Sequence, residues 1–331
     1  MKKKVLLTKP FFEKDINYIK SGLLPEVELI TPENYELETL LSLSKDVEVF
    51  LGPNLLPNLL ENAKNLELIQ IPWTGVDKLE LSNLKGYDFV LCNSHSNSLA
   101  VAEHSVALAL SLLKKIPYHH NELKKGIWNR PKADASNEVS PFSISVKDLN
   151  IGLLGYGSIA AKIHKLLLGF ECNFYVCSKS PKDFSKETRV SESFLLENID
   201  DFLQHINILF VCLPLTSETN QLLDSSKLKY LKDGYLVNTA RGEIINEKDL
   251  FELLSKKTIK GAAIDTWTGI IKDGEKPSSF GFEKLNNVIL SPHRAGMIKG
   301  ALPHLDDAVT NINNLCQGLP LINIVDINKK Y

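Results

Sequence analysis

A glycine-rich segment near the middle of the chain has the residue types and the spacing that a phosphate-binding loop needs. Gly155, Gly157 and Ala160 follow an apolar run over residues 151–154 and open a helical pattern over residues 161–168. Gly155 permits a tight turn, Gly157 lets the backbone approach a pyrophosphate, and Ala160 lets the helix pack closely on the strand. The helix N-terminus adds N–H groups and a positive dipole end. We therefore predict a dinucleotide-binding loop, with cofactor contacts from Gly155, Tyr156, Gly157, Ser158 and Ile159.

The residues after the next predicted strand bear on which dinucleotide this loop accepts. An NAD site has an acidic residue about 20 residues beyond the glycines, where it binds the ribose 2′-hydroxyl. This chain has Ser178, Lys179 and Ser180 at that place, without an aspartate or glutamate. Two hydroxyls and a lysine would bind a 2′-phosphate, which a carboxylate would repel. We expect NADP(H) to be favoured over NAD(H); alternatively, Ser178 only ends a strand and Lys179 is a solvated surface charge.

The elements that must position these residues are predicted by two alternating periods. Short β-rich runs alternate with helically spaced apolar residues, which argues for parallel sheets covered by helices on both faces. The first hundred residues predict a flavodoxin-like half, with strands at 5–7, 27–30, 47–51, 66–71 and 89–91 and helices at 35–43 and 55–63. A larger βαβ domain resumes at Leu149, with strands at 150–154, 173–177, 206–212, 235–239, 262–264 and 288–290.

The remaining segments complete the predicted architecture. A long apolar helix is predicted over residues 99–113, and the polar stretch 119–145 has little periodicity and is interpreted as an arm or loop. A further helix is predicted over residues 302–315. We expect the chain to cross between the two domains twice. The helix over residues 99–113 would make the first crossing and the helix over residues 302–315 the second. The predicted fold class is α/β, with two doubly wound parallel-sheet domains.

The composition excludes several other classes of protein. A chain of 331 residues is long enough for about two domains, and 38 basic against 40 acidic residues give a formal net charge of −2. It has no overall field that attracts nucleic acid or an anionic membrane. The N-terminal apolar run stops at Thr8, and no run approaches the roughly 20 residues that cross a bilayer. The five cysteines form no Cys-x-x-Cys pair, so we expect free thiols, no metal site and a cytoplasmic protein.

Short motifs, distributed in order along almost the whole chain, point to one family. They are Gly75-Val76-Asp77, Val101-Ala102-Glu103-His104, Gly126-x-Trp128, the glycine loop, Leu213-Pro214-Leu215-Thr216-x-Glu218-Thr219, Val237-Asn238-Thr239-Ala240-Arg241-Gly242, Ala263-Ile264-Asp265 and Ser291-Pro292-His293-x-Ala295-Gly296. In these motifs the chain resembles the D-isomer-specific 2-hydroxyacid dehydrogenases, which include glyoxylate and hydroxypyruvate reductases. The resemblance implies a flavodoxin-like substrate domain at 1–98 plus 299–331 and an inserted Rossmann NAD(P)-binding domain at 99–298. It also implies a homodimer, with residues 119–145 as the arm.

The resemblance also implies roles for single residues. Arg241 would hold the carboxylate and carbonyl of a small substrate, which suits a planar guanidinium that stays charged. His293 would be the general acid/base, which suits an imidazole with an ordinary pKa near 6.5. Asp265 would contact the nicotinamide region. Further cofactor contacts are implied for Leu213, Pro214, Thr219, Thr239, Ala240, Arg241 and His293, and substrate contacts for Trp73, Thr74 and Gly75.

One position departs from the family pattern. Most members carry a glutamate five residues after the Asp265 equivalent, where it holds the histidine, and this chain has Ile270 there. Isoleucine cannot orient an imidazole, so we expect the pKa of His293 to be lower than in relatives. Asp273 or Glu275 would replace the glutamate only if the loop were rearranged; otherwise they are ordinary loop acids.

The departure at Ile270 leaves three interpretations open. The first is a reductase of a small 2-oxo acid, such as glyoxylate or hydroxypyruvate, that works without the glutamate. The second is hydride abstraction without proton transfer, because residues 97–104 and 126–129 look like formate dehydrogenase, in which the equivalent of Asn97 helps to bind formate. The third is a non-catalytic NAD(P)-sensing protein. A pure sensor would need neither Arg241 nor His293, and their presence favours an enzyme.

Overall fold

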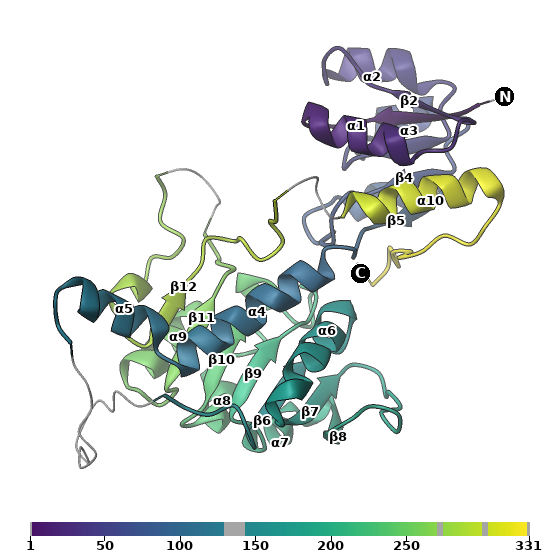
Figure 1. The fold of residues 1–331 in the computed structure, drawn as a ribbon. Coiled ribbons are helices and arrows are strands. Elements are labelled where there is room, and N and C mark those ends of the chain that lie inside the picture. The colour runs from purple at the N-terminus through teal and green to yellow at the C-terminus, as the bar shows by residue number, and fades with distance from the viewer. Residues whose placement is uncertain (1, 129–142, 270–273, 300–303, 330–331) are drawn as a thin grey trace. The chain divides into compact units, whose positions relative to one another are not determined.

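The computed structural model describes residues 2–128, 143–269, 274–299 and 304–329. It divides into two compact units, residues 1–97 with 297–331 and residues 98–296. The expected boundaries, 98/99 and 298/299, lie one and two residues from these. Both units are α/β with parallel sheets, as the sequence predicts (Figure 1).

The first unit is a five-stranded parallel sheet in the flavodoxin-like order β2-β1-β3-β4-β5. Successive side chains of a strand point to opposite faces, so Val5 and Leu7 pack against α1 and α10, whereas Leu6 packs against α2 and α3. The elements are β1 (Lys3–Leu7), α1 (Glu13–Gly22), β2 (Val27–Ile30), α2 (Leu37–Ser44), β3 (Val49–Leu51), α3 (Pro57–Asn62), β4 (Leu68–Gln70), β5 (Val90–Cys92) and α10 (Leu305–Gln317).

The second unit is a seven-stranded parallel sheet in the order β12-β11-β10-β9-β6-β7-β8 (Figure 1). Its strands are β6 (Asn150–Leu154), β7 (Asn173–Ser178), β8 (Val190–Leu195), β9 (Ile208–Val211), β10 (Tyr235–Asn238), β11 (Gly261–Ile264) and β12 (Val288–Leu290). Helices α4 (Ser98–Leu113) and α6 (Ser158–Leu167) cover one face, and α7 (Ile199–Gln204), α8 (Ser225–Leu228) and α9 (Glu247–Ser255) cover the other.

Each sheet has a topological switch point, at which successive strands continue on opposite sides. In the first unit the switch lies between β1 and β3, and in the second between β6 and β9. Open α/β sheets bind ligands in the crevice outside the carboxyl ends of the strands at such points. The loops after β1 and β3, and those after β6 and β9, are therefore the places where function is expected.

One prediction about local structure was wrong, and one strand was missed. The segment from residue 119 was expected to be irregular, but α5 (Ile116–Lys124) is a helix. Lys115 adopts a left-handed conformation that ends α4, and Pro117 fits the first turn of a new helix because no helical N–H is required there. The edge strand β8 was not expected, since its sequence has three consecutive polar residues, Ser191, Glu192 and Ser193. The predicted arm over residues 129–142 lies outside the described residues.

The other findings concern thiols and membrane spans. All five cysteines are free, as expected, and burial raises the pKa of Cys92 and Cys177 to about 12. None of the described helices is both long and apolar enough to cross a membrane.

Candidate active site

Three neighbouring strands bring Arg241, Asp265 and His293 to one edge of the seven-stranded sheet. The last residues of β10, β11 and β12 are in register, with Asn238 beside Ile264 and Ile264 beside Leu290. Beyond them the backbone stays linked, because Asp265 N donates to Asn238 O at 2.9 Å and His293 N donates to Asp265 O at 2.9 Å. The turns that carry the two residues expected to do the chemistry are thus both hydrogen-bonded to Asp265.

The carboxylate of Asp265 organises the turn that carries His293. It is fully buried and accepts hydrogen bonds from the Ser291 hydroxyl, from Arg294 N at 2.8 Å and from Ala295 N at 3.0 Å. His104 on α4 joins this group, with its Nε2 3.0 Å from Ser291 Oγ and 3.6 Å from Asp265 Oδ1. Since these oxygens bond to the chain itself, Asp265 acts as a positioning residue, and a contact with the nicotinamide stays a prediction.

His293 lies on the outside of this turn in an unusual conformation. Its φ is 57°, in the left-handed region, and its side chain is exposed. A non-glycine residue in that region costs about 1–3 kcal/mol and persists only where its surroundings hold it. Here the hydrogen bonds to Asp265 on both sides of the turn supply that constraint. Ile270 and Asp273 lie outside the described residues, and Glu275 is exposed.

A second turn, after β10, holds Arg241. Asn238 is buried, and its amide bonds both sides of the turn: Nδ2 donates to Arg241 O at 2.9 Å and Oδ1 accepts from Ala240 N at 3.0 Å. Gly242 is required next, because a Cβ there would lie 2.4 Å from the backbone carbon of Trp267. On the other side, Thr239 Oγ1 lies 2.8 Å from Ser105 Oγ on α4. The guanidinium is therefore presented from a fixed backbone.

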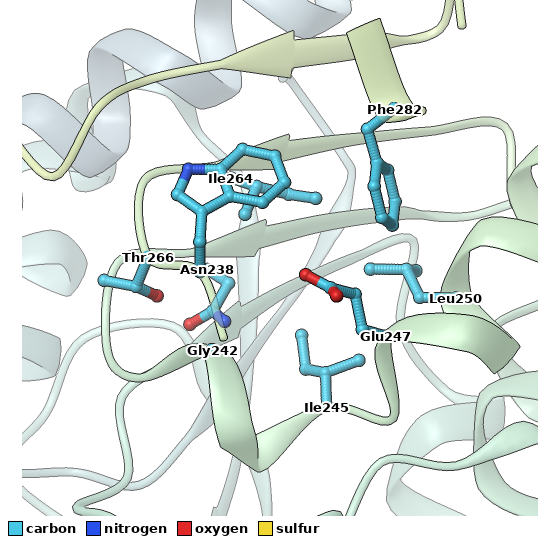
Figure 2. Close-up of a pocket in the computed structure, with 9 residues that line it drawn as sticks. Asn238, Gly242, Ile245, Glu247, Leu250, Ile264, Thr266 and Phe282 are labelled. Atoms are coloured by element: carbon cyan, nitrogen blue, oxygen red, sulfur yellow. The ribbon is translucent and has the colours of Figure 1, made fainter. Parts of the chain in front are cut away.

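A pocket lies behind this turn (Figure 2). Its volume is about 240 Å³ with its open mouth included, and the carboxylate of Glu247 points into it. Glu247 Oε2 accepts a hydrogen bond from Thr268 Oγ1 at 2.9 Å. Neither Arg241 nor His293 lines the pocket, so it is not formed by the residues expected to do the chemistry. The lining residues are Asn238, Gly242, Ile245, Glu247, Leu250, Ile264, Thr266, Trp267 and Phe282.

The glycine loop between β6 and α6 has the geometry that the sequence predicts for a dinucleotide site. Gly155 has φ +91°, and a Cβ there would lie 2.7 Å from Cys212 O, so no other residue fits. At Gly157, by contrast, a Cβ would meet no atom within 4 Å, which leaves room for a ligand. Gly157 also caps α6 without a side-chain hydrogen bond, and Ala160 is fully buried against the sheet. These residues fit a bound pyrophosphate.

A buried histidine supports the glycine loop from behind. Tyr156 Oη lies 2.7 Å from His164 Nδ1, and His164 Nε2 lies 2.8 Å from Thr188 O. Phe184 stacks edge-on against Tyr156 with ring centroids 4.8 Å apart. The pKa of Tyr156 is raised to about 12, first by burial and then by the nearby charge of Glu187. The side chain of Tyr156 thus joins the glycine loop to the segment between β7 and β8.

The residues expected to contact the adenosine end lie on the loops after β7 and β9. Ser178 Oγ donates to Ser180 O at 2.8 Å and shapes the turn. Lys179 Nζ lies 2.6 Å from Glu218 Oε2, and both side chains are about half exposed. Thr219 is buried, and its hydroxyl donates to Pro214 O at 2.7 Å, which closes its own loop. Leu213 is also buried, and Pro214 is exposed.

In the first unit, the expected substrate loop follows β4. Thr74 Oγ1 donates to Ser94 O at 2.8 Å, and Asn97 Oδ1 lies 3.2 Å from the same hydroxyl. Asn93 Nδ2 donates back to Thr74 O at 2.6 Å. Trp73 is partly buried, and the Lys9 ammonium lies over its ring. The predicted substrate residues Trp73, Thr74, Gly75 and Asn97 therefore form one bonded cluster or adjoin it.

Several functional positions were not predicted from the sequence. The supporting roles of His104, Ser291 and Asn238, and the pairing of Lys179 with Glu218, depend on contacts between distant segments. Each of these residues except Lys179 stands in one of the family motifs, which was the available signal.

The fold and the glycine loop are those of a nucleotide-binding α/β protein. The model of the D-isomer specific 2-hydroxyacid dehydrogenase NAD-binding domain matches residues 106–295, and the chain belongs to this family. It is 30% identical to D-3-phosphoglycerate dehydrogenase of Archaeoglobus fulgidus over 98% of the chain, but spans only 59% of that protein.

The chain is also similar in sequence to a second relative and in fold to a solved structure. A D-lactate dehydrogenase of Staphylococcus epidermidis is 30% identical over 75% of this chain and 74% of its own. A probable 2-hydroxyacid dehydrogenase from Rhizobium etli, solved with NADP, HEPES and L(+)-tartaric acid, superposes with a TM-score of 0.80 at 22% identity over 100% of both chains.

Proposed function

We propose that the protein transfers hydride between a nicotinamide cofactor and a small 2-oxo or 2-hydroxy acid, with reduction of the 2-oxo acid as its working direction. The observation that carries the proposal is the common edge of β10, β11 and β12. Arg241 and His293 there extend from turns that are both hydrogen-bonded to Asp265. The match of the family model to residues 106–295 supports the reaction class.

Each residue has a definite task in this reaction. The Arg241 guanidinium holds the substrate carboxylate with two parallel hydrogen bonds and polarises the carbonyl. His293 donates a proton to the carbonyl oxygen as hydride reaches the carbonyl carbon, so the C=O group becomes CH–OH. The bound nicotinamide is the hydride donor. Asp265 and Asn238 keep the two turns in place without contacting the substrate, and Trp73, Thr74, Gly75 and Asn97 provide further substrate contacts.

We infer that NADP(H) is preferred over NAD(H). The open space at Gly157 and the uncapped start of α6 support binding of the pyrophosphate. Lys179 supports the choice of cofactor, because it is a cation placed after β7, where NAD enzymes carry an acid. The Rhizobium etli structure of the same fold holds NADP.

We also propose that the protein is a cytoplasmic homodimer. Helix α5 has no buried residue, and it exposes Ile116, Tyr118 and Leu123. An apolar helix surface of this kind is consistent with a partner subunit. Analytical ultracentrifugation at micromolar concentration should give twice the mass of 37.0 kDa, and a monomer would contradict the proposal.

The reaction is tested by following NADPH oxidation with glyoxylate, hydroxypyruvate and pyruvate. We expect turnover with at least one acid, lost in both Arg241→Ala and His293→Ala, while Lys182→Ala, an exposed lysine in the loop after β7, behaves as wild type. Formate oxidation without 2-oxo acid reduction would favour the formate dehydrogenase alternative. Tight cofactor binding without turnover of any acid would favour a sensor.

A further inference from the structure

A lysine with unusual surroundings lies at the switch point of the first unit. Lys9 is the second residue after β1, and the neighbouring Thr8 N donates to Leu51 O at the end of β3. Its ammonium lies 4.7 Å from the ring centroid of Phe11 and 5.2 Å from that of Trp73. Among the described residues, no carboxylate lies within ion-pair distance of it. The side chain is therefore a partly buried cation placed between two aromatic faces.

Behind Lys9 lies a group that stabilises the positive charge of the ammonium but, among the described residues, accepts no hydrogen bond from it. Asp15 on α1 is fully buried, and within the described part of the chain neither of its carboxylate oxygens has a hydrogen-bond partner. Burial lowers the pKa of Lys9, whereas the negative charge of Asp15 raises it. Asp15 thus favours the ammonium form from a distance. Because Asp15 has no exposed surface, an incoming ligand meets Lys9 rather than the carboxylate.

Two further polar groups near Lys9 have no hydrogen-bond partner among the residues that the structure describes. They are the hydroxyl of Thr8, a residue that is 5% exposed, and Nδ1 of His304, and both atoms are buried. Lys9 is close enough to His304 for its charge to contribute to the lowered pKa of that imidazole, after burial. Buried polar groups without partners are rare, and each calls for an explanation such as a bound ligand or water. Their position at the carboxyl ends of β1 and β3 is where this sheet type binds ligands.

We propose that Lys9 is a specificity-determining residue that binds a second anionic group on the substrate, so that the preferred 2-oxo acid carries a carboxylate or phosphate at its far end. The inference rests on the proposed function through Trp73, because the loop expected to contact the substrate is the one that Lys9 overlies. An anion bound here would receive charge-assisted hydrogen bonds from the ammonium and lie against the edge of the Trp73 ring.

The simpler alternative is that Lys9 only packs its methylene stem and ammonium on the two rings. Lys9→Met separates these possibilities, since it keeps the length and the apolar stem and removes the charge. Lys9→Arg is the matched variant that keeps the charge. Lys20→Met removes an exposed charge from α1 of the same unit and serves as the control.

The test compares monoanionic 2-oxo acids (pyruvate, 2-oxobutyrate) with acids that carry a second carboxylate (oxaloacetate, 2-oxoglutarate) or a phosphate (3-phosphohydroxypyruvate). We expect wild type and Lys20→Met to prefer a doubly anionic acid. Lys9→Met should raise the KM for that acid about tenfold, with kcat and the monoanion KM within about twofold. Lys9→Arg should retain most of the preference. An unchanged preference in Lys9→Met, or a wild-type preference for monoanions, would overturn the inference.

A binding measurement separates this inference from the proposed reaction. Calorimetric titration of 2-oxoglutarate and 2-oxobutyrate without reduced cofactor needs no turnover. One outcome would contradict the proposed reaction and support the anion site. In that outcome no acid is reduced, 2-oxoglutarate binds more tightly than 2-oxobutyrate to wild type, and Lys9→Met removes this difference in affinity. Equal affinities for both acids in wild type would overturn the anion site, whether or not the enzyme turns over.

Discussion

Lys179 Nζ lies 2.6 Å from Glu218 Oε2, and this pair joins the loops after β7 and β9 on either side of the glycine loop. Because β7 and β9 flank β6, the two side chains meet beside the crevice where a dinucleotide is expected. A 2′-phosphate that binds Lys179 would have to compete with the Glu218 carboxylate. The pair is thus placed to set the balance between the two nicotinamide cofactors.

The first prediction is that Glu218→Gln lowers the KM for NADPH. Both side chains are about half exposed, and exposed ion pairs contribute only about 0.2–1 kcal/mol, so the decrease should be about twofold to fivefold. The KM for NADH should change less, since NADH has no phosphate to attract. Steady-state kinetics with both cofactors at fixed ionic strength measures the change. Lys179→Ala should act in the opposite direction, and a strong preference of the wild type for NADH would contradict the assignment.

The second prediction concerns Asp265, whose carboxylate accepts hydrogen bonds from the Ser291 hydroxyl and the Arg294 and Ala295 amides. Asp265→Asn leaves one of these donors facing an NH2 group, which costs about 1–3 kcal/mol for an unsatisfied buried group. We expect the free energy of unfolding to fall by that amount and kcat to fall at least tenfold, because the His293 turn loses its support.

The cofactor KM then distinguishes two roles for Asp265. A residue that only positions the turn should leave the KM for NADPH within about twofold while kcat falls. Ser291→Ala, which removes a single donor, is the matched variant and should lower kcat less. A large rise in the cofactor KM with little change in kcat would instead indicate a direct contact with the nicotinamide.

The fold could be predicted from the sequence because it is carried by local periodicity. Alternating β-rich and helical runs suffice to indicate two parallel sheets, and α4 was expected within one residue of its observed start at Ser98. Helix α5 was not predicted because the polar run from His119 to Glu122 interrupts its few apolar residues, and none of them is buried. Strand β8 was not predicted because an edge strand needs little burial, and three consecutive polar residues, Ser191, Glu192 and Ser193, stand in its middle.

Site residues that stand in short sequence motifs could be predicted, whereas pairs formed by contacts between distant segments of the chain could not. Arg241 and His293 stand in short motifs at predicted strand ends. The hydrogen bond between His104 and Ser291 joins residues 187 positions apart, and the Lys179–Glu218 bond joins residues 39 apart. No local pattern specifies such pairs. Their existence depends on the strand order, which the sequence predicts only as a class.

The third prediction addresses the support behind the glycine loop. Tyr156→Phe removes the 2.7 Å hydrogen bond to His164 Nδ1 and keeps the ring contact with Phe184. We expect the KM for the cofactor to rise about threefold to tenfold, which corresponds to the roughly 1 kcal/mol of a typical hydrogen bond, with kcat unchanged. Tyr175→Phe, on β7 of the same unit, is a control for loss of a tyrosine hydroxyl. An equal effect in both variants would contradict a specific role for Tyr156.

The last prediction is that stability falls on mild acidification. Burial lowers the pKa of His95, against an opposing effect of Asp307, and burial together with Lys9 lowers the pKa of His304 against Asp15, Asp306 and Asp307. A histidine whose pKa is lower in the folded state binds its proton more readily when unfolded. Its contribution to stability is therefore fully present above its unfolded pKa, near 6.5, and is lost as the pH falls through the pKa of the folded state.

Urea unfolding at pH 7.5 and pH 5.5 should show a lower free energy of unfolding at pH 5.5. His95→Gln should reduce that difference, whereas His119→Gln, on the exposed helix α5, should leave it as in wild type. The same difference in both variants would show that other groups control the acid response.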